Sequence, residues 1–181
     1  PKSSSDGRLR LLIPGRLSKH KGLDLLLQAL PQLLPIAQIT LLGCDREGFH
    51  LLGQSGIDII PNYNNQDLPG LVAQIQPDAC LLLSIVPETF SYTLSEMWSL
   101  GVVPIATELG SFAERIQDYE NGILFSPQAQ ALVATIQQLH QEPEILSELA
   151  SQVKAQADLS IQDMLDLYEQ QWPQPTHISY R

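Results

Sequence analysis

The sequence predicts an α/β fold with a doubly wound, mainly parallel sheet of six strands and helices on both faces. Short apolar segments alternate with stretches of helical periodicity along the chain, which is the order expected when crossover helices join parallel strands. The apolar segments are continuously hydrophobic rather than alternating. That pattern is typical of strands that are covered on both faces.

Six segments carry the strand pattern. Each is short and apolar, and most end in a residue that favours turns, such as Gly, Pro, Asn or Ser. The expected strands cover residues 9–15, 38–43, 57–62, 79–84, 102–107 and 122–126. Sheets of this kind bind ligands at the carboxyl ends of their strands, so the loops that follow these segments are the candidate binding site.

The stretches between the strands carry apolar residues at helical spacing. The expected helices cover residues 22–34, 46–54, 66–75, 92–100 and 111–118, and three more at 128–141, 143–156 and 160–171 close the chain. Pro31 is expected to bend the first helix or to mark its end, because proline lacks the N–H that the helical hydrogen bond needs.

The length of 181 residues predicts one domain, or one domain with an appendage. We expect residues 8–173 to form the folded domain, residues 1–7 to be a linker or an added terminal segment, and residues 174–181 to be a C-terminal tail. The chain does not begin with Met, and we expect it to be part of a longer protein. No apolar run approaches the length of a membrane-spanning helix, so no transmembrane segment is expected.

The formal net charge of −10 argues against binding to nucleic acid or to anionic lipid. Cys44 and Cys80 match no zinc or redox spacing, so we interpret them as reduced core thiols of a cytoplasmic protein. The histidines have no partners at metal-ligand spacing, and no metal site is expected. Basic residues gather near the N-terminus, where six of the ten occur: Lys2, Arg8, Arg10, Arg16, Lys19 and Lys21.

The segment PGRLSKHKG, residues 14–22, follows the first strand and opens the first helix. It is neither a P-loop nor a GxGxxG motif, so it favours neither a Walker-type nor a nicotinamide-dinucleotide site. Gly15 provides a tight turn, and Arg16 and Lys21 lie beside a helix N-terminus. Two cations with free backbone N–H groups suit a diphosphate. The alternative is a solvated basic loop.

The segment PETFSYTLSEMWSLG, residues 87–101, places Glu88 in the loop after the fourth strand and Glu96 in the following helix. The pattern Thr93-x-x-Glu96 fits a capping box, so Glu96 has a structural alternative. For Glu88 the alternative is a solvated loop residue. A loop carboxylate there can accept hydrogen bonds from sugar hydroxyls, while the helix N-terminus holds phosphates.

The segments GRLSKHKG, PETFSYTLSEMWSLGVVPIAT and ELGSFAERIQDYENGILF resemble the C-terminal half of a group 1 (family 4) glycosyltransferase. The resemblance runs from about residue 8 to about residue 172, nearly the whole chain. It implies the GT-B architecture of two Rossmann-like domains, a retaining mechanism, and a nucleotide-sugar-binding domain over residues 8–173. The phrase ETFSYTLSE is similar to members that work on bacterial surface polysaccharides.

The resemblance also implies roles for individual residues. Arg16 and Lys21 would bind the diphosphate and stabilise it as the leaving group, while Glu88 would position the sugar; these three are the expected catalytic residues. Glu96 would take the ribose hydroxyls. The remaining expected donor-binding residues are Gly15 at the turn, Pro61, Asn62 and Tyr63 near the base, and Phe90, Ser91, Tyr92 and Thr93 through their backbone amides. Neither a cofactor nor a metal is required.

The implied substrate is a UDP- or GDP-sugar, and the implied acceptor is a glycan or a lipid-linked sugar bound by an N-terminal domain outside this chain. The isolated domain should therefore be inactive. The rest of the parent protein would place it in the cytoplasm or at the inner face of the membrane. Thr89, Ser91 and Ser111 stand where the family often has glycine. Of these, Ser91 and Ser111 favour an alternative, a nucleotide-sugar-binding module without turnover. A sugar-nucleotide epimerase is a third hypothesis, but it needs acid and base carboxylates beyond the pair found.

Overall fold

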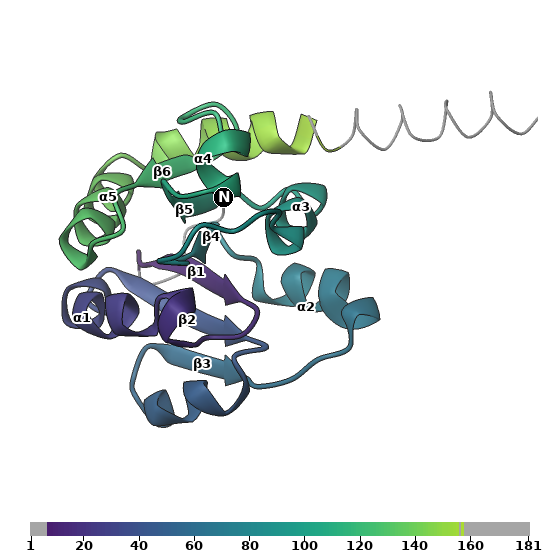
Figure 1. Cartoon of the computed structure of the whole chain (residues 1–181). Helices are drawn as coiled ribbons and strands as arrows, with labels where there is room; N and C mark the ends of the chain where they lie inside the picture. The colour runs from purple at the N-terminus through teal and green to yellow at the C-terminus, as the bar shows by residue number, and fades with distance from the viewer. Residues whose placement is uncertain (1–6, 156, 158–181) are drawn as a thin grey trace, which may run out of the picture.

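The structure, a computed structural model, describes residues 7–155 and 157, and it contains a six-stranded sheet with helices on both faces (Figure 1). The strands are β1 (Leu9–Pro14), β2 (Ala37–Leu42), β3 (Ile57–Ile60), β4 (Ala79–Leu82), β5 (Pro104–Thr107) and β6 (Ile123–Phe125). Their order in the sheet is β3-β2-β1-β4-β5-β6, and neighbouring strands pair in parallel. The predicted fold class is confirmed.

The helices follow the strands as the sequence predicts, with shorter bounds. They are α1 (Leu23–Leu33), α2 (Leu68–Ile75), α3 (Tyr92–Ser99), α4 (Ser111–Arg115) and α5 (Ala129–Gln141). There are also three 3₁₀ segments among the described residues. The first, η1 (Lys19–Lys21), precedes α1, and η3 (Asn65–Asp67) precedes α2. The remaining segment, η2 (Asp45–Leu51), stands in place of the helix expected at 46–54. Residues 143–155 are helical.

Pro31 does not end the first helix, because α1 continues to Leu33. The expected helix at 160–171, the expected linker apart from Gly7, and the expected tail lie outside the described residues.

The core has two layers, one on each face of the sheet. Leu11 and Ile13 of β1 belong to one layer with buried side chains of α1, α5 and the helix at 143–155, whereas Leu12 belongs to the other layer with side chains of α2, α3 and α4. Successive strand residues point to opposite faces, so a strand buried on both faces is apolar throughout. The free, buried Cys44 and Cys80 lie in different layers, and the prediction of unpaired thiols is confirmed.

The strand order reverses between β1 and β4, which are neighbours at the centre of the sheet. The chain proceeds outward from β1 to β3 and then returns to β4 before it proceeds outward again to β6. At such a switch point the loops after the two central strands diverge and leave a crevice between them. The loops that follow β1 and β4 are those that carry Arg16, Lys21 and Glu88.

Candidate functional site

The cleft at the switch point collects residues from both motifs. Its lining includes residues from the end of β1 and the loop that follows it, and from β4 and the loop before α3; the expected site residues among them are Gly15, Arg16, Lys21, Glu88, Ser91 and Thr93. Gly15 has a φ of 85°, a left-handed conformation that glycine adopts without strain. The predicted turn at Gly15 is confirmed.

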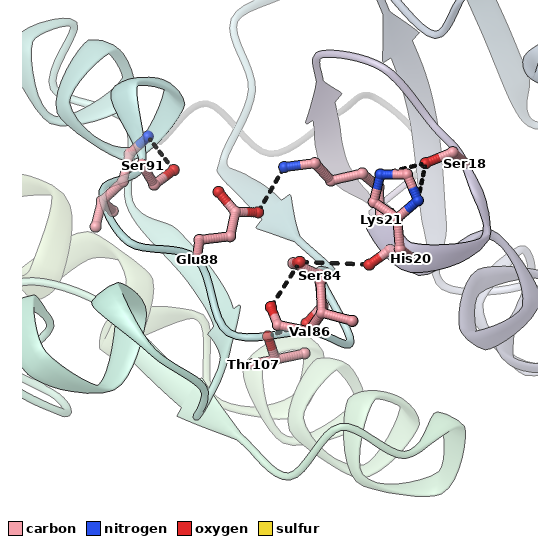
Figure 2. A network of polar contacts seen from close by, with 9 residues as sticks. Ser18, His20, Lys21, Ser84, Val86, Glu88, Ser91 and Thr107 are labelled. Carbon is pink, nitrogen blue, oxygen red and sulfur yellow. Dashed lines mark hydrogen bonds and ion pairs between the residues drawn. The ribbon is translucent and has the colours of Figure 1, made fainter.

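Lys21 and Glu88 form an ion pair. Lys21 Nζ lies 2.6 Å from Glu88 Oε1, and the Glu88 side chain retains 18% of its exposure (Figure 2). The interpretation of Glu88 as a freely solvated loop residue is therefore wrong. A carboxylate and an ammonium group thus face each other in the lining of the cleft.

The backbone of Glu88 is fixed by the turn that begins α4. Ser111 N–H donates to the Glu88 carbonyl at 2.9 Å. Gly110 has a φ of 50°, and a Cβ built there would lie 2.7 Å from both the nitrogen and the carbonyl oxygen of Glu88. Glycine is therefore required at this point, because any side chain would displace the loop that carries Glu88.

A network of hydroxyl groups connects three loops at the base of the cleft (Figure 2). Ser84 Oγ shares its one hydroxyl hydrogen between the carbonyls of Val86 at 3.0 Å and His20 at 3.3 Å. Thr107 Oγ1 donates to the Ser84 carbonyl at 2.6 Å. Both hydroxyl residues are buried. Sequence reasoning did not single them out, although polar residues directly at the ends of apolar strands are a usable signal.

Ser91 is the N-cap of α3. Its Oγ accepts a hydrogen bond from Leu94 N–H at 3.2 Å, and the helix begins at Tyr92. The predicted capping box of Thr93 and Glu96 is wrong, because a box requires its acidic partner at the third helical position, which is Leu94. Glu96 therefore has no capping role, and the interpretation of Glu96 as a capping residue is excluded.

Glu96 lies near Tyr63, one of the residues expected beside the base. Burial, and secondarily the negative charge of Glu96, raise the pKa of the Tyr63 hydroxyl. The Tyr63 ring packs on Gly43, where a Cβ would lie 2.7 Å from the ring. The end of β3 and the first turns of α3 thus approach each other beyond the cleft, and neither Tyr63 nor Glu96 lines the cleft itself.

The other expected donor-binding residues lie outside the cleft lining, and all but the half-buried Pro61 are exposed. Asn62 is exposed after β3, and Phe90 and Tyr92 are exposed by 50% and 76%. The two aromatic rings meet edge to face at 5.1 Å, and the Arg115 guanidinium lies 4.3 Å from the centre of the Phe90 ring. Arg115 also donates to the Ser91 carbonyl at 3.1 Å. This contact joins α4 to the loop before α3.

Arg16 is paired with two carboxylates that follow β2. Its Nη2 lies 3.2 Å from Glu47 Oε1, and its Nε lies 3.9 Å from Asp45 Oδ2. The Arg16 side chain remains 64% exposed, so this contact leaves the guanidinium open to a ligand. Sequence reasoning did not foresee the pairing, although two acids just after the carboxyl end of a strand were a signal.

The cleft is small, at about 70 Å³, whereas pockets that enclose a small-molecule ligand measure roughly 300–1,000 Å³. It therefore forms one wall of a ligand site rather than an enclosed pocket. Within residues 7–155 and 157, no three His, Cys, Asp or Glu side chains come together in a way that could hold a metal ion. Of the helices in that same part of the chain, none has both the length and the apolar character needed to cross a bilayer.

The family model of the group 1 glycosyl transferases matches residues 1–158. The chain belongs to this family. No curated protein sequence matches the chain. As a group 1 glycosyl transferase domain, it has the fold that the resemblance of its motifs implied.

Solved structures of glycosyltransferases contain a domain with the same Rossmann-like fold as this chain. Sucrose-phosphate synthase from Thermosynechococcus elongatus matches at a TM-score of 0.71 and 22% identity, over 92% of this chain and 46% of that protein. HepE from Anabaena, solved with UDP and glucose, matches at a TM-score of 0.70 and 20% identity, over 92% of this chain and 49% of that protein. This chain therefore spans about half the length of these two proteins.

A third solved structure covers a single domain. The C-terminal domain of the group 1 glycosyl transferase LpcC from Francisella tularensis matches at a TM-score of 0.62 and 19% identity, over 81% of this chain and 83% of that one. This agreement in extent is consistent with a C-terminal domain of a group 1 glycosyl transferase.

Proposed function

We propose that this chain is the donor-binding domain of a retaining glycosyltransferase, which transfers a sugar from a UDP- or GDP-sugar to an acceptor hydroxyl. The acceptor is a glycan or a lipid-linked sugar held by an N-terminal domain outside this chain, and the enzyme acts in the cytoplasm in bacterial polysaccharide synthesis. The observation that carries the proposal is that Arg16, Lys21 and Glu88 line one cleft at the switch point of the sheet.

The class of donor is supported by the ligands of similar structures. HepE was solved with UDP-glucose, and the catalytic domain of Arabidopsis starch synthase IV was solved with ADP. A nucleoside diphosphate carries its charge on the two phosphates, and this cleft offers a guanidinium, an ammonium group and the N-terminus of α3. These groups are complementary to a diphosphate.

Arg16 and Lys21 supply the main catalytic effect in this proposal. When the bond between the sugar and the diphosphate breaks, negative charge grows on the leaving phosphate, and fixed cations beside it lower the energy of the transition state. The backbone amides from Phe90 to Thr93 and the dipole of α3 add to this stabilisation. The residues present thus stabilise the leaving group without requiring a metal ion or a cofactor.

Glu88 has two partners in succession. Without a ligand its carboxylate accepts from Lys21. When the diphosphate attracts Lys21, the carboxylate becomes available to accept hydrogen bonds from the sugar hydroxyls. Farther along the edge of the sheet, Asn62 and Tyr63 border the base and Glu96 accepts from the ribose. Gly15 lets the backbone approach the phosphates closely.

A calorimetric titration tests the proposal. We expect the chain to bind UDP, GDP or ADP weakly, because one wall of the site is present, and to transfer no sugar by itself. Changing both Arg16 and Lys21 to Ala should remove most of this binding. Lys154→Ala is the control, since it removes a positive charge from the helix at 143–155, outside the cleft. Equal binding by the double variant and the parent would contradict the proposal.

A second candidate function is a nucleotide-sugar-binding module without turnover. Ser91 and Ser111, at positions where glycine is frequent in the family, favour it, and both are buried beside the loop of Glu88. Ser91 has a local explanation as the N-cap of α3. Transfer of sugar by the full-length protein would exclude the module. An epimerase is not proposed, because the chain belongs to the group 1 glycosyl transferases.

A further inference from the structure

The turn after β2 carries a carboxylate that the proposed function does not use. Glu47 Oε1 lies 3.2 Å from Arg16 Nη2. A backbone hydrogen bond from Leu17 N–H to the Cys44 carbonyl, at 3.5 Å, joins the loop of Arg16 to the turn of Glu47. A second bond, from Asp45 N–H to the Pro61 carbonyl at 3.2 Å, joins that turn to the loop after β3. The loop of Arg16 and the turn of Glu47 are thus joined through their main chains, so the ion pair is part of the assembled site.

The second oxygen of Glu47 distinguishes it from an ordinary surface carboxylate. Glu47 Oε2 is buried and has no hydrogen-bond partner among the described residues. A buried carboxylate oxygen without a donor costs stability. Because the pairing with Arg16 is largely exposed, it offsets little of that cost. The fold therefore gains little stability from an acid at this position, whereas a ligand of Arg16 would lie beside its negative charge.

Asp45 has a different, structural role. The distance from Arg16 Nε to Asp45 Oδ2 is longer, at 3.9 Å. The other oxygen, Asp45 Oδ1, accepts a hydrogen bond from the backbone N–H of Arg46 at 2.8 Å. Asp45 thus stabilises its own turn, while Glu47 is the carboxylate that competes for the guanidinium.

We propose that Glu47 is a specificity-determining residue that makes the site prefer the intact nucleotide-sugar to the spent nucleoside diphosphate. This inference rests on the proposed function, in which Arg16 binds the diphosphate. In a nucleotide-sugar both phosphates are esterified. After transfer, the terminal phosphate of the product can lose a second proton, with a pKa of about 6, and so carries close to one more negative charge at neutral pH.

A carboxylate beside Arg16 acts on that additional charge. It repels both ligands, and it repels the more negative product more strongly. It also occupies an edge of the guanidinium that a terminal phosphate would otherwise contact. Glu47 therefore lowers the affinity for the product more than the affinity for the donor, which helps the product to leave.

The test compares Glu47→Gln with the parent chain in calorimetric titrations of UDP and UDP-glucose at low ionic strength. GDP and GDP-mannose replace them if the guanine nucleotide is the one that binds. We expect the affinity for the diphosphate to increase about threefold to tenfold, and the gain for the sugar conjugate to be about threefold smaller. Added salt should shrink both gains, because it screens the charge that the exchange removes.

Glu148→Gln is the matched control, since it removes one exposed carboxylate from the helix at 143–155 and should leave both affinities unchanged. A gain in affinity cannot result from a damaged fold. If Glu47→Gln binds both ligands as the parent does, gains equally for both, or binds the diphosphate less tightly, the inference is wrong and the proposed function stands. If the parent binds none of the nucleotides, the proposed function is wrong and the inference fails with it.

Discussion

Lys21 Nζ lies 2.6 Å from Glu88 Oε1, in an ion pair that joins the loop after β1 to the loop after β4 across 67 residues. In the proposed function each partner has its own ligand group, the diphosphate for Lys21 and the sugar for Glu88. A nucleoside diphosphate alone takes Lys21 and leaves Glu88 without its cation. A nucleotide-sugar supplies a partner for both, so the sugar should add affinity through Glu88.

The two glutamates of the 87–101 segment should respond differently to the same exchange. Glu88→Gln should not weaken the binding of UDP or GDP, because it removes a competitor for Lys21, but it should reduce the additional affinity that the sugar provides. Glu96→Gln should weaken the binding of both ligands by about 1–3 kcal/mol, because the amide presents a donor where the ribose hydroxyls need an acceptor. Calorimetric titration with a diphosphate and its sugar conjugate measures both effects. Equal losses of both ligands at Glu88, or none at Glu96, would refute the assignment.

Ser91→Ala should destabilise the domain by about 1 kcal/mol, because the N-cap hydroxyl accepts from an otherwise unpaired N–H of α3. Thr93→Ala is the matched control, since Thr93 lies inside the first turn of the helix and should change the free energy of unfolding by less than half of that. Urea denaturation followed by circular dichroism gives both values. A larger loss for Thr93→Ala would restore the capping box that the sequence suggested.

Gly110→Ala should be among the most harmful exchanges at a glycine near the cleft. The added Cβ would overlap the backbone of Glu88, at 2.7 Å from its nitrogen and oxygen, and we expect a loss of about 2–4 kcal/mol in the free energy of unfolding together with loss of ligand binding. Gly53→Ala separates overlap from backbone strain, because Gly53 also has a positive φ but open space around it. Gly53→Ala should lower the free energy of unfolding by about 1 kcal/mol. Similar losses of stability for the two variants would show that the contact between position 110 and Glu88 does not matter.

The two thiols should be unreactive in the native state. Burial raises the pKa of Cys80 far above its ordinary value, and burial, followed by the neighbouring Asp45 and Glu47, raises the pKa of Cys44. Both thiols therefore stay protonated at neutral pH, and the thiolate is the reactive form. Ellman's reagent should label neither thiol rapidly at pH 8 in buffer and both rapidly in denaturant. Fast labelling of one thiol in buffer would contradict this prediction and would mean that the core layer containing that thiol is accessible to the reagent.

The sequence by itself determined the order of the strands and helices, and it selected the loops in which we place the candidate site. Continuous apolar segments such as 79–84 can be buried only in a sheet that is covered on both faces, so hydrophobicity alone indicated the parallel sheet. The rule that parallel sheets bind ligands at the carboxyl ends of their strands then selected the loops of Arg16, Lys21 and Glu88. These are local properties, which a short window of sequence contains.

Only the tertiary structure decided which residues meet. The pairs Lys21–Glu88 and Arg16–Glu47 join loops that are 67 and 31 residues apart, and nothing in either loop encodes its distance from the other. The order of the strands brings the loops together. The N-cap of α3 shows the same limit at short range: Ser91 and Thr93 both fit the capping pattern, and the choice depends on the residue at which the chain turns into the helix. That point is set by long-range contacts, because Arg115 and the turn at Gly110 hold the backbone from Glu88 to Ser91 against the rest of the fold.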